Sequence, residues 1–263
     1  IKIKMIKIII FLVFAIAILL KYVWNLFNIK CMFISLDGNI GSGKSTLLKK
    51  IKQHIPNVVT LQEPVSKWLS IKNEDGKNFL DVFYTDKKRW SYTFQNLAYL
   101  TRMELLFNAF EDMKKTTFSN IWNRLIGNTF VIISERSVLT DKNTFAKMLK
   151  DSDDMNDMEY TLYEKCFPVL LNKIKITNVI YLQTDPVNSF ERLKQRGRNE
   201  EDSIPFEYIE SVNDYHNRWL LNKDNGLKVL VLDGNRDFEL DDLNSKLHLT
   251  EMISKVKKFI GYL

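Results

Sequence analysis

Residues 38–45 read Gly-Asn-Ile-Gly-Ser-Gly-Lys-Ser and fit the pattern G-x-x-x-x-G-K-[ST]. Glycines at these positions let backbone N–H groups turn toward phosphate oxygens, and a helix that begins directly afterwards presents its positive end to the same anion. The pattern needs a buried strand before it and a helix after it. An apolar run at 32–37 and a helical pattern at 45–53 supply both. The segment therefore predicts a phosphate-binding loop on an α/β sheet.

Each position of this loop is a predicted ligand of a nucleoside triphosphate. The expected phosphate-binding residues are Gly38, Asn39, Ile40, Gly41, Ser42, Gly43, Lys44, Ser45 and Thr46. Lys44 is expected to hold the β- and γ-phosphates, and Ser45 to bind Mg²⁺.

Short apolar runs alternate with longer helical patterns along the rest of the chain. The expected strands are 32–37, 58–62, 130–134, 178–183 and 228–232, and the expected helices include 45–53, 89–113, 139–150, 155–172, 187–196, 205–222 and 241–259. Such alternation predicts a five-stranded parallel sheet with helices on both faces. Ligands of such a sheet bind beyond the carboxyl ends of its strands.

Charged side chains follow these strands at the expected edge. Glu63 ends the second strand and is followed by a proline. A carboxylate beside a transferred phosphate could accept the proton of an attacking hydroxyl, although a lone Glu at a strand end is often solvated. Glu135 and Arg136 end the third strand. The two residues could form a structural ion pair with each other. Alternatively, Glu135 lies near a metal ion and the Arg136 guanidinium bridges the acceptor hydroxyl and the phosphate.

Two helical segments carry further candidates. Arg192, Arg196 and Arg198 flank Gly197 and predict a phosphate-covering lid, although basic residues at a helix end can simply complement its dipole. Gln95, Ala98 and Arg102 share one face of the predicted helix 89–113, which is either solvent-facing or turned to a cleft. Three aromatic residues either belong to the core or, if their helices line the cleft, stack on a ligand: Trp68, Trp90 and Phe145.

Composition excludes several classes of function. Five of the 38 basic residues are lysines within 1–31, where no acid occurs, so the remainder carries 33 basic and 32 acidic residues. This near-neutral body argues against a nucleic-acid partner. The two cysteines and three histidines are scattered, which argues against disulfides, a zinc site and a Ser/His/Asp triad.

Residues 1–31 form a basic and hydrophobic N-terminal segment, distinct from a catalytic domain at 32–263. A thirteen-residue apolar run at 8–20 follows a lysine-rich start and is short for a membrane span. The alternatives are an extension without a role in catalysis, a membrane anchor and a targeting peptide. The expected location is the cytoplasm, and membrane contact or organelle targeting could arise only through this segment.

The chain from 32 to the C-terminus resembles the deoxynucleoside kinase family, in particular its deoxycytidine and deoxyguanosine kinase branch. The resemblance rests on six segments in order: 33–46, Glu63-Pro64-Val65 with Trp68, 84–95, Glu135-Arg136-Ser137 with Asp141, 192–201 and 204–208. It implies a P-loop kinase fold with a small arginine-bearing lid. It also implies transfer of the γ-phosphate of ATP to the 5′-hydroxyl of a deoxynucleoside, with Mg²⁺, in nucleotide salvage by a homodimer.

The resemblance also implies roles for individual residues. Glu63 is the general base, Lys44 and Arg136 act with it, and Glu135 joins Ser45 at the metal. Tyr84 and Glu201 bind the sugar 3′-hydroxyl, and Gln95 reads the base. The remaining implied nucleoside-binding residues are Trp68, Arg102, Arg136, Asp141 and Phe145, and the implied donor-base segment runs from Asp233 to Phe238.

Base preference is predicted from hydrogen-bonding capacity. An Asp141 kept ionised by Arg102 only accepts hydrogen bonds, so it favours an exocyclic amine over the carbonyl of thymine. Arg102 could itself donate to O6 and N7 of guanine. Deoxycytidine and purine deoxynucleosides are therefore expected to be preferred over thymidine. The alternatives to this function are a nucleoside monophosphate kinase and an inactive membrane-tethered structural subunit with the same fold. A GTPase is less favoured because residues 222–225 do not form an N-K-x-D motif.

Overall fold

Five strands form one parallel sheet in the order β2-β3-β1-β4-β5. The computed structural model describes residues 14, 16–20, 31–119, 130–171 and 174–262. The strands are β1 (Cys31–Asp37), β2 (Val58–Leu61), β3 (Phe130–Glu135), β4 (Ile176–Gln183) and β5 (Lys228–Asp233). The predicted five-stranded parallel sheet is confirmed, and each strand boundary lies within two residues of its prediction.

Helices connect the strands in the order that right-handed crossovers require. They are α2 (Lys44–His54), α3 (Val65–Ser70), α4 (Phe79–Thr85), α5 (Lys87–Ser119), α7 (Val138–Thr140), α8 (Lys147–Asp151), α9 (Asp157–Leu171), α10 (Pro186–Arg196), α11 (Phe206–Leu220) and α12 (Leu243–Phe259). Shorter turns are η1 (Asp141–Ala146), η2 (Asn199–Glu201) and η3 (Lys223–Asn225). The single helix predicted at 139–150 is instead α7, the π-helical η1 and α8 in succession.

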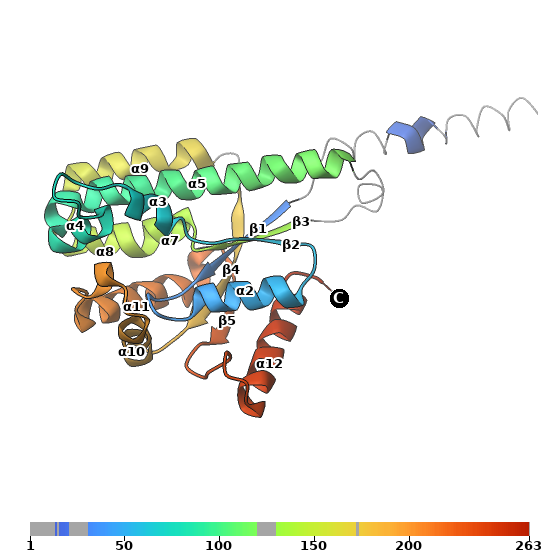
Figure 1. The fold of residues 1–263 in the computed structure, drawn as a ribbon. Helices are drawn as coiled ribbons and strands as arrows, with labels where there is room; N and C mark the ends of the chain where they lie inside the picture. Colours follow the sequence, from blue (N-terminus) through green and yellow to red (C-terminus); the bar gives the residue numbers. More distant parts are fainter. Residues whose placement is uncertain (1–13, 15, 21–30, 120–129, 172–173, 263) are drawn as a thin grey trace, which may run out of the picture.

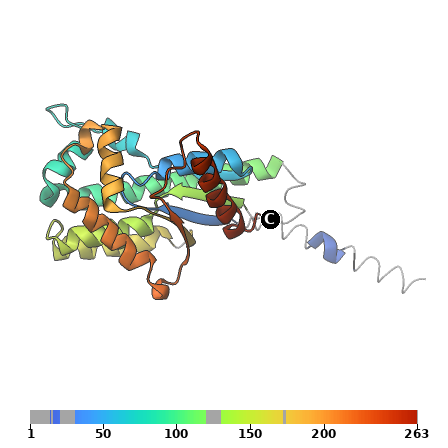
Figure 2. The ribbon, with the colours of Figure 1, turned by 90° about the horizontal axis from the view of Figure 1, so that it is seen from below.

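The sheet lies between two layers of helices, as Figure 1 shows. Alternate residues of β1 enter different cores: Phe33 packs toward α5 and α9, whereas Ile34 and Leu36 pack toward α2 and α12. Seen from below in Figure 2, α2 and α12 lie over the same side of the sheet. Full burial of such side chains contributes about 1.5–3 kcal/mol each. Coverage of both faces explains why the strands read as continuous apolar runs.

The loops that follow β1, β2 and β3 meet at one edge of the sheet because these strands are parallel neighbours. Leu36 lies opposite Glu135 in the register, and the Arg136 N–H donates to the Leu36 carbonyl at 2.9 Å. The phosphate-binding loop, Glu63 and Arg136 are thereby brought together from three separate parts of the sequence.

Candidate functional site

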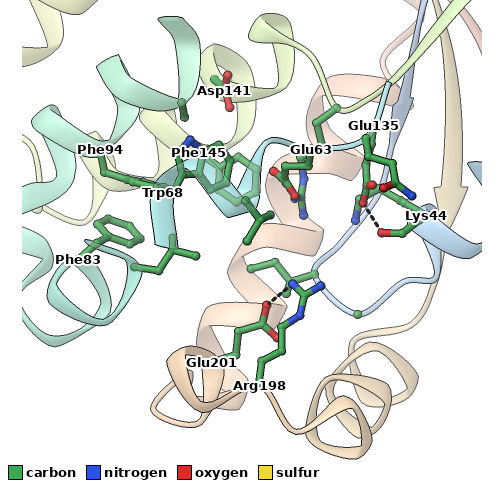
Figure 3. Close-up of a pocket in the computed structure, with 18 of the residues that line it drawn as sticks. Lys44, Glu63, Trp68, Phe83, Phe94, Glu135, Asp141, Phe145, Arg198 and Glu201 are labelled. Carbon is green, nitrogen blue, oxygen red and sulfur yellow. Dashed lines mark hydrogen bonds and ion pairs between the residues drawn. The ribbon is translucent and has the colours of Figure 1, made fainter. Parts of the chain in front are cut away.

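A cavity of about 240 Å³ opens at this edge, which is room for a ligand of many atoms. In Figure 3, aromatic side chains form one end of the cavity, Lys44, Glu63 and Glu135 form the other, and Glu201 and Arg198 lie beneath them. The residues that line it come from α2, α3, α4, α5, η1, α10, η2, α11, the end of β3 and the loops after β1, β2, β3 and α10. A second cavity, described below, continues from it across Lys44 and Ser45.

The phosphate-binding loop has the backbone that its glycines permit. Gly41 and Gly43 have φ values of 77° and 93°, and a Cβ on Gly41 would lie 2.1 Å from the Ser189 carbonyl oxygen. Lys44 Nζ donates to the Asn39 carbonyl at 2.5 Å. Burial, together with the nearby charge of Arg136, lowers the pKa of Lys44 to about 7. The predicted phosphate lysine is therefore buried, and the charges of Glu135 and Glu63 offset only part of the effect of burial on its pKa.

Ser45 and Glu135, the two residues predicted to bind a metal ion, lie in contact. The Ser45 hydroxyl donates to Glu135 Oε1 at 2.7 Å, which places two oxygen ligands at the start of α2. Hydroxyl and carboxylate oxygens suit Mg²⁺, which usually takes only one or two protein ligands beside substrate phosphates. No cluster of three or more His, Cys, Asp or Glu side chains is present in the described parts of the chain, which fits such a sparse site.

Glu63 is held between two arginines. Arg136 Nη1 donates to both carboxylate oxygens of Glu63, at 2.9 and 2.8 Å, and Arg102 Nη2 donates to Oε1. Burial alone would raise the pKa of Glu63, but Arg136, Arg102 and Lys44 together lower it to about 2. Glu63 is therefore an ionised carboxylate that faces the cavity, and the solvated-loop alternative is wrong.

Arg136 adopts a left-handed backbone conformation with a φ of 58°, which costs energy in a non-glycine residue. Its guanidinium lies 5.1 Å from the centre of the Phe145 ring. Burial lowers its pKa, but Glu63 and Glu135 outweigh burial and raise it. The local ion pair that was the alternative for Glu135 and Arg136 does not form, because Glu135 binds Ser45 while Arg136 binds Glu63.

The predicted helix face on α5 turns into the cavity. Gln95 and Arg102 are buried, so the solvent-facing alternative for this face is wrong. Arg102 Nη1 lies 3.3 Å from Asp141 Oδ1 and also serves Glu63 through Nη2. Burial raises the pKa of Asp141 to about 7 despite Arg102. The expectation that Arg102 keeps Asp141 fully ionised is therefore corrected: in the empty site the two protonation states of Asp141 are comparable near neutral pH.

Several buried polar atoms at this end have no hydrogen-bond partner among the described residues. They are Gln95 Oε1, Arg102 Nε, Arg136 Nε and Nη2, and Asp141 Oδ2. Buried polar atoms are rarely left without partners, so such a group indicates a ligand or ordered water. The mixture of donors and acceptors suits the edge of a nucleobase.

Aromatic rings close the same end. Trp68 lies edge-on to Phe94 with ring centroids 5.2 Å apart, and its Nε1 donates to Thr101 Oγ1 at 3.1 Å. Trp68 and Phe145 line the cavity, whereas Trp90 does not and packs edge-on against Phe79. Trp90 thus packs against the core, whereas Trp68 and Phe145 are buried side chains that also line the cavity.

The lower wall of the cavity carries Tyr84 and Glu201. Burial, with Tyr208 and Glu201, raises the pKa of Tyr84 well above its ordinary value, so its hydroxyl stays protonated. Glu201 pairs with Arg196, and its Oε1 lies 3.4 Å from Arg198 Nη1. Tyr84, Glu201 and two of the predicted lid arginines therefore lie at the same wall of the cavity.

The second cavity is lined by the phosphate-binding loop, Glu135, the predicted lid arginines and residues 237–239. Phe238 is buried against Gly43, where a Cβ would lie 3.2 Å from the ring. Arg192 lines this cavity, but its guanidinium donates to two backbone carbonyls. Asp233 lies outside the lining and accepts from the Asn235 N–H at 2.9 Å.

Some lining residues were not anticipated from the sequence. Leu80 and Phe83 reach the first cavity from α4, and Lys49 lies at the junction of the two cavities. The spacing of Leu80, Phe83 and Tyr84 is that of one helical face. Asn78 caps this helix by accepting from the Asp81 N–H at 3.0 Å, so an N-cap signal was available in the sequence.

Two ligand subsites therefore meet at Lys44 and Glu135. One is partly aromatic, with hydrogen-bonding groups and an ionised carboxylate, and the other is a glycine-rich anion site with three arginines. A hydroxyl-bearing ring compound in the first and a polyphosphate in the second would bring a nucleophile and a phosphoryl group together.

Comparison with known proteins agrees with this geometry. The family model described as deoxynucleoside kinase matches residues 34–261. Deoxycytidine kinase 2 of Gallus gallus is 32% identical over 251 residues, which cover 86% of this chain and 89% of that protein. The probable deoxycytidine kinase of Fowlpox virus (strain NVSL) is 36% identical over 234 residues, 88% of each chain. The mitochondrial deoxyguanosine kinase of Xenopus laevis is 31% identical over 250 residues, covering 87% of this chain and 89% of that protein.

Proposed function

From the premise that this chain belongs to the deoxynucleoside kinase family, we propose that Glu63 is the general base that activates the 5′-hydroxyl of a bound deoxynucleoside. Membership makes the chain a deoxynucleoside kinase, a phosphotransferase that uses a nucleoside triphosphate as donor. The observation that carries the proposal is the position of Glu63, which is ionised, faces the first cavity and is oriented by Arg136. ATP is the proposed donor.

The proposed transfer moves one proton and one phosphoryl group. The 5′-hydroxyl oxygen attacks the γ-phosphorus while its proton passes to the Glu63 carboxylate. The bond between the γ-phosphorus and the β,γ-bridging oxygen breaks, so the products are a deoxynucleoside 5′-monophosphate and ADP. Arg136 donates hydrogen bonds to the carboxylate of Glu63, and Lys44 belongs to the phosphate-binding loop. Both can therefore stabilise charge that spreads over the transferred group.

Ser45 and Glu135 are proposed to hold Mg²⁺, and the support is the direct contact between their oxygens. The ion would supply charge neutralisation for the β- and γ-phosphates. Glu135 also fixes the orientation of the Ser45 hydroxyl, which lies at the start of α2, by accepting its hydrogen bond. A carboxylate at this point would otherwise repel the triphosphate.

The test of the reaction class measures ATP turnover by the purified chain with the four deoxynucleosides and, separately, their monophosphates. Turnover with deoxynucleosides supports the proposal. Turnover with the monophosphates alone would favour the nucleoside monophosphate kinase alternative. The inactive-subunit alternative predicts no turnover, and the convergence of Lys44, Glu63 and Arg136 on one cavity argues against it.

Base preference is proposed to depend on Arg102 and Asp141. The ionised form of Asp141 accepts from an exocyclic amine, as on cytosine or adenine, but repels the carbonyl of thymine. Arg102, whose Nε has no hydrogen-bond partner among the described residues, can donate to O6 and N7 of guanine. Deoxycytidine and purine deoxynucleosides are therefore the preferred acceptors.

The double change Arg102→Met with Asp141→Ala is expected to raise thymidine kcat/KM relative to deoxycytidine. It removes both charges together, whereas loss of Arg102 alone would leave a buried carboxylate unpaired at a cost of about 3–5 kcal/mol. Steady-state kinetics with both nucleosides measure the change. Because Arg102 also contacts Glu63, Asp141→Asn is the control that leaves this contact in place. A wild-type enzyme that already prefers thymidine would refute the argument.

Homodimerisation is proposed through α5 and α9, which lie side by side in Figure 1. The support is a set of exposed apolar side chains on the two helices. They are Leu100, Met158 and Leu162. Sedimentation equilibrium of the purified chain measures its oligomeric state. A monomer at all concentrations would contradict the proposed homodimer.

Residues 1–31 are proposed to have no role in catalysis, and the expected cytoplasmic location stays a proposal. Of this segment the structure describes residues 14, 16–20 and the first residue of β1, and no helix in the described ranges is long and apolar enough to cross a membrane.

Removal of residues 1–31 is expected to leave kcat/KM unchanged within about twofold, because every residue that lines the two cavities comes from position 40 or later. The measurement compares kcat/KM and thermal unfolding for both forms. Loss of folding on truncation would show that the removed segment packs against the domain.

A further inference from the structure

Asp37 is a fully buried carboxylate that lines neither cavity. It ends β1, directly before the phosphate-binding loop, and its Oδ1 accepts a hydrogen bond from the Thr140 hydroxyl. Burial raises the pKa of Asp37 despite this bond and the nearby charges of Arg136 and Lys44. Its ionisation at neutral pH therefore opposes folding, which indicates a role other than packing of the core.

Thr140 connects Asp37 to the turn that follows Arg136. Its Oγ1 accepts from the Ser137 N–H at 3.1 Å, while its own hydroxyl donates to Asp37. Ser137 is the N-cap of α7 and comes directly after Arg136, and Thr140 is the third residue of this helix. The Asp37 carboxylate therefore fixes the start of α7 through a chain of two hydrogen bonds.

Arg136 is held by two consecutive residues of β1. Its N–H donates to the Leu36 carbonyl at 2.9 Å, and Asp37 holds the following residue through Thr140. A left-handed backbone with a φ of 58° is unfavourable in a non-glycine residue and persists only where the surrounding structure fixes it. The backbone sets the direction in which the side chain leaves the chain. The two bonds from Arg136 Nη1 to the Glu63 carboxylate therefore depend on these anchors.

We propose that Asp37 is a positioning residue for phosphoryl transfer, which holds the backbone of Arg136 in place through its bond to Thr140. Arg136 in turn orients the carboxylate of Glu63, so the inference rests on the proposed catalytic roles of these two residues. Asp37 lines neither cavity and reaches no substrate. Loss of its bond should therefore lower kcat and leave the KM of both substrates nearly unchanged.

Two variants separate the hydrogen bond of Asp37 from its charge. Asp37→Asn removes the negative charge but keeps an oxygen that can accept from Thr140. Thr140→Val keeps the charge of Asp37 and the shape of the threonine side chain, but it cannot donate. If Asp37 acted only through its charge on Arg136, Asp37→Asn would be the slower enzyme. Positioning through the hydrogen bond predicts the opposite order.

The experiment compares the steady-state kinetics of these variants with those of the wild-type chain, using ATP and a deoxynucleoside. Thr140→Val is expected to lower kcat by roughly tenfold, which corresponds to the loss of one buried hydrogen bond, with both KM values within about twofold. Thr140→Ser restores the hydroxyl and should recover most of this loss. Asp37→Asn should lower kcat by no more than about threefold, because its amide oxygen still accepts the bond.

Thr144→Val is the matched control. Thr144 lies one turn further along the same helical segment, lines neither cavity, and carries a buried hydroxyl with no hydrogen-bond partner among the described residues. The change is the same in chemistry and burial as Thr140→Val, yet it breaks no bond to Asp37. Its kcat should therefore stay within about twofold of the wild type, and a loss equal to that of Thr140→Val would overturn the proposal.

A double-mutant cycle identifies the residue through which Asp37 acts. In an Arg136→Met background, Thr140→Val should lower kcat no further, because the side chain that it positions is already gone. The same tenfold loss in both backgrounds would show a general structural effect and overturn the proposal. Unchanged kcat in Thr140→Val, or slower turnover by Asp37→Asn than by Thr140→Val, would also overturn it. If Thr140→Val does not fold, Thr140→Ala removes the same hydroxyl with less bulk and takes its place.

A crystal structure of Thr140→Val provides a readout that needs no turnover. Arg136 should leave the left-handed region or lose its bonds to Glu63, and an Arg136 that keeps both would overturn the proposal. Absence of turnover in the wild type, or full turnover by Arg136→Met, would instead contradict the proposed function. The conformation of Arg136 in Thr140→Val would still decide whether Asp37 positions it.

Discussion

Replacing Lys44 with alanine is expected to reduce phosphoryl transfer by at least roughly 10²–10³-fold, to the limit of detection. Lys44 Nζ is held in the loop by the Asn39 carbonyl at 2.5 Å, and its positive charge can stabilise the charge that spreads over the transferred group. Steady-state turnover with saturating ATP and acceptor measures the effect. Lys44→Met keeps the packing of the aliphatic stem and should be equally inactive.

The two Lys44 variants are expected to be at least as stable as the wild type, because the lysine side chain is buried. Lys44 is only 4% exposed, so its side chain is buried. Its folded pKa of about 7 lies below the ordinary 10.5, so charging Lys44 destabilises the fold at pH values below 10.5. Its removal should therefore not lower the melting temperature, and an unfolded Lys44→Met protein would contradict this account.

Triphosphate binding should also restore the charge of Lys44. Above pH 7 the empty site holds a largely neutral lysine, and bound phosphates raise its pKa. Calorimetry in buffers of different ionisation enthalpy should show proton uptake by the wild type and a smaller uptake by Lys44→Met. Retained turnover in either Lys44 variant would contradict the role of the loop.

The strands and their common edge could be predicted from sequence because each is a short apolar run that ends in a chemically distinctive residue. Glu63 after β2 and Arg136 after β3 lie far apart along the chain, yet a parallel sheet brings their positions together. The loop motif identified the first strand, and alternation with helices identified the other four as parallel strands, but it did not give their order in the sheet.

Partners within the site could not be predicted in the same way. Sequence placed Glu135 and Arg136 side by side as a possible pair, but β3 ends at Glu135 and Arg136 has a left-handed backbone with a φ of 58°. Glu135 instead meets Ser45, and Arg136 meets Glu63. The sharing of Arg102 between Glu63 and Asp141 likewise depends on how α5 and η1 pack, which no spacing in the sequence encodes.

Tyr84 was expected at the cavity, but Leu80 and Phe83 of the same helix, α4, were missed because this helix is short. Its seven residues are too few for periodicity to distinguish helix from strand. The protonation of Asp141 was also beyond sequence reasoning, since burial, rather than the identity of its neighbour, decides its pKa.

Replacing Glu63 with glutamine is expected to lower kcat by roughly 10²–10⁴-fold, with a modest change in nucleoside binding, because a positioned base acts mainly in the transition state. The variant also leaves two buried guanidinium groups without their carboxylate, which costs about 3–5 kcal/mol of stability if no anion replaces it. Thermal unfolding must therefore accompany the kinetics. Glu63→Asp keeps the charge but shortens the reach, so it should be stable and still slow.

The pH dependence separates loss of a base from loss of structure. The folded pKa of Glu63, about 2, lies below its ordinary 4.5, so its ion pairs stabilise the fold fully above pH 4.5 and lose this effect as the pH falls toward 2. Wild-type activity should accordingly show no acid limb from Glu63 in the empty enzyme between about pH 5 and 8. Glu63→Gln should be slow across that whole range. Wild-type turnover in a folded Glu63→Gln protein would remove Glu63 from the reaction and leave Arg136 without a catalytic partner.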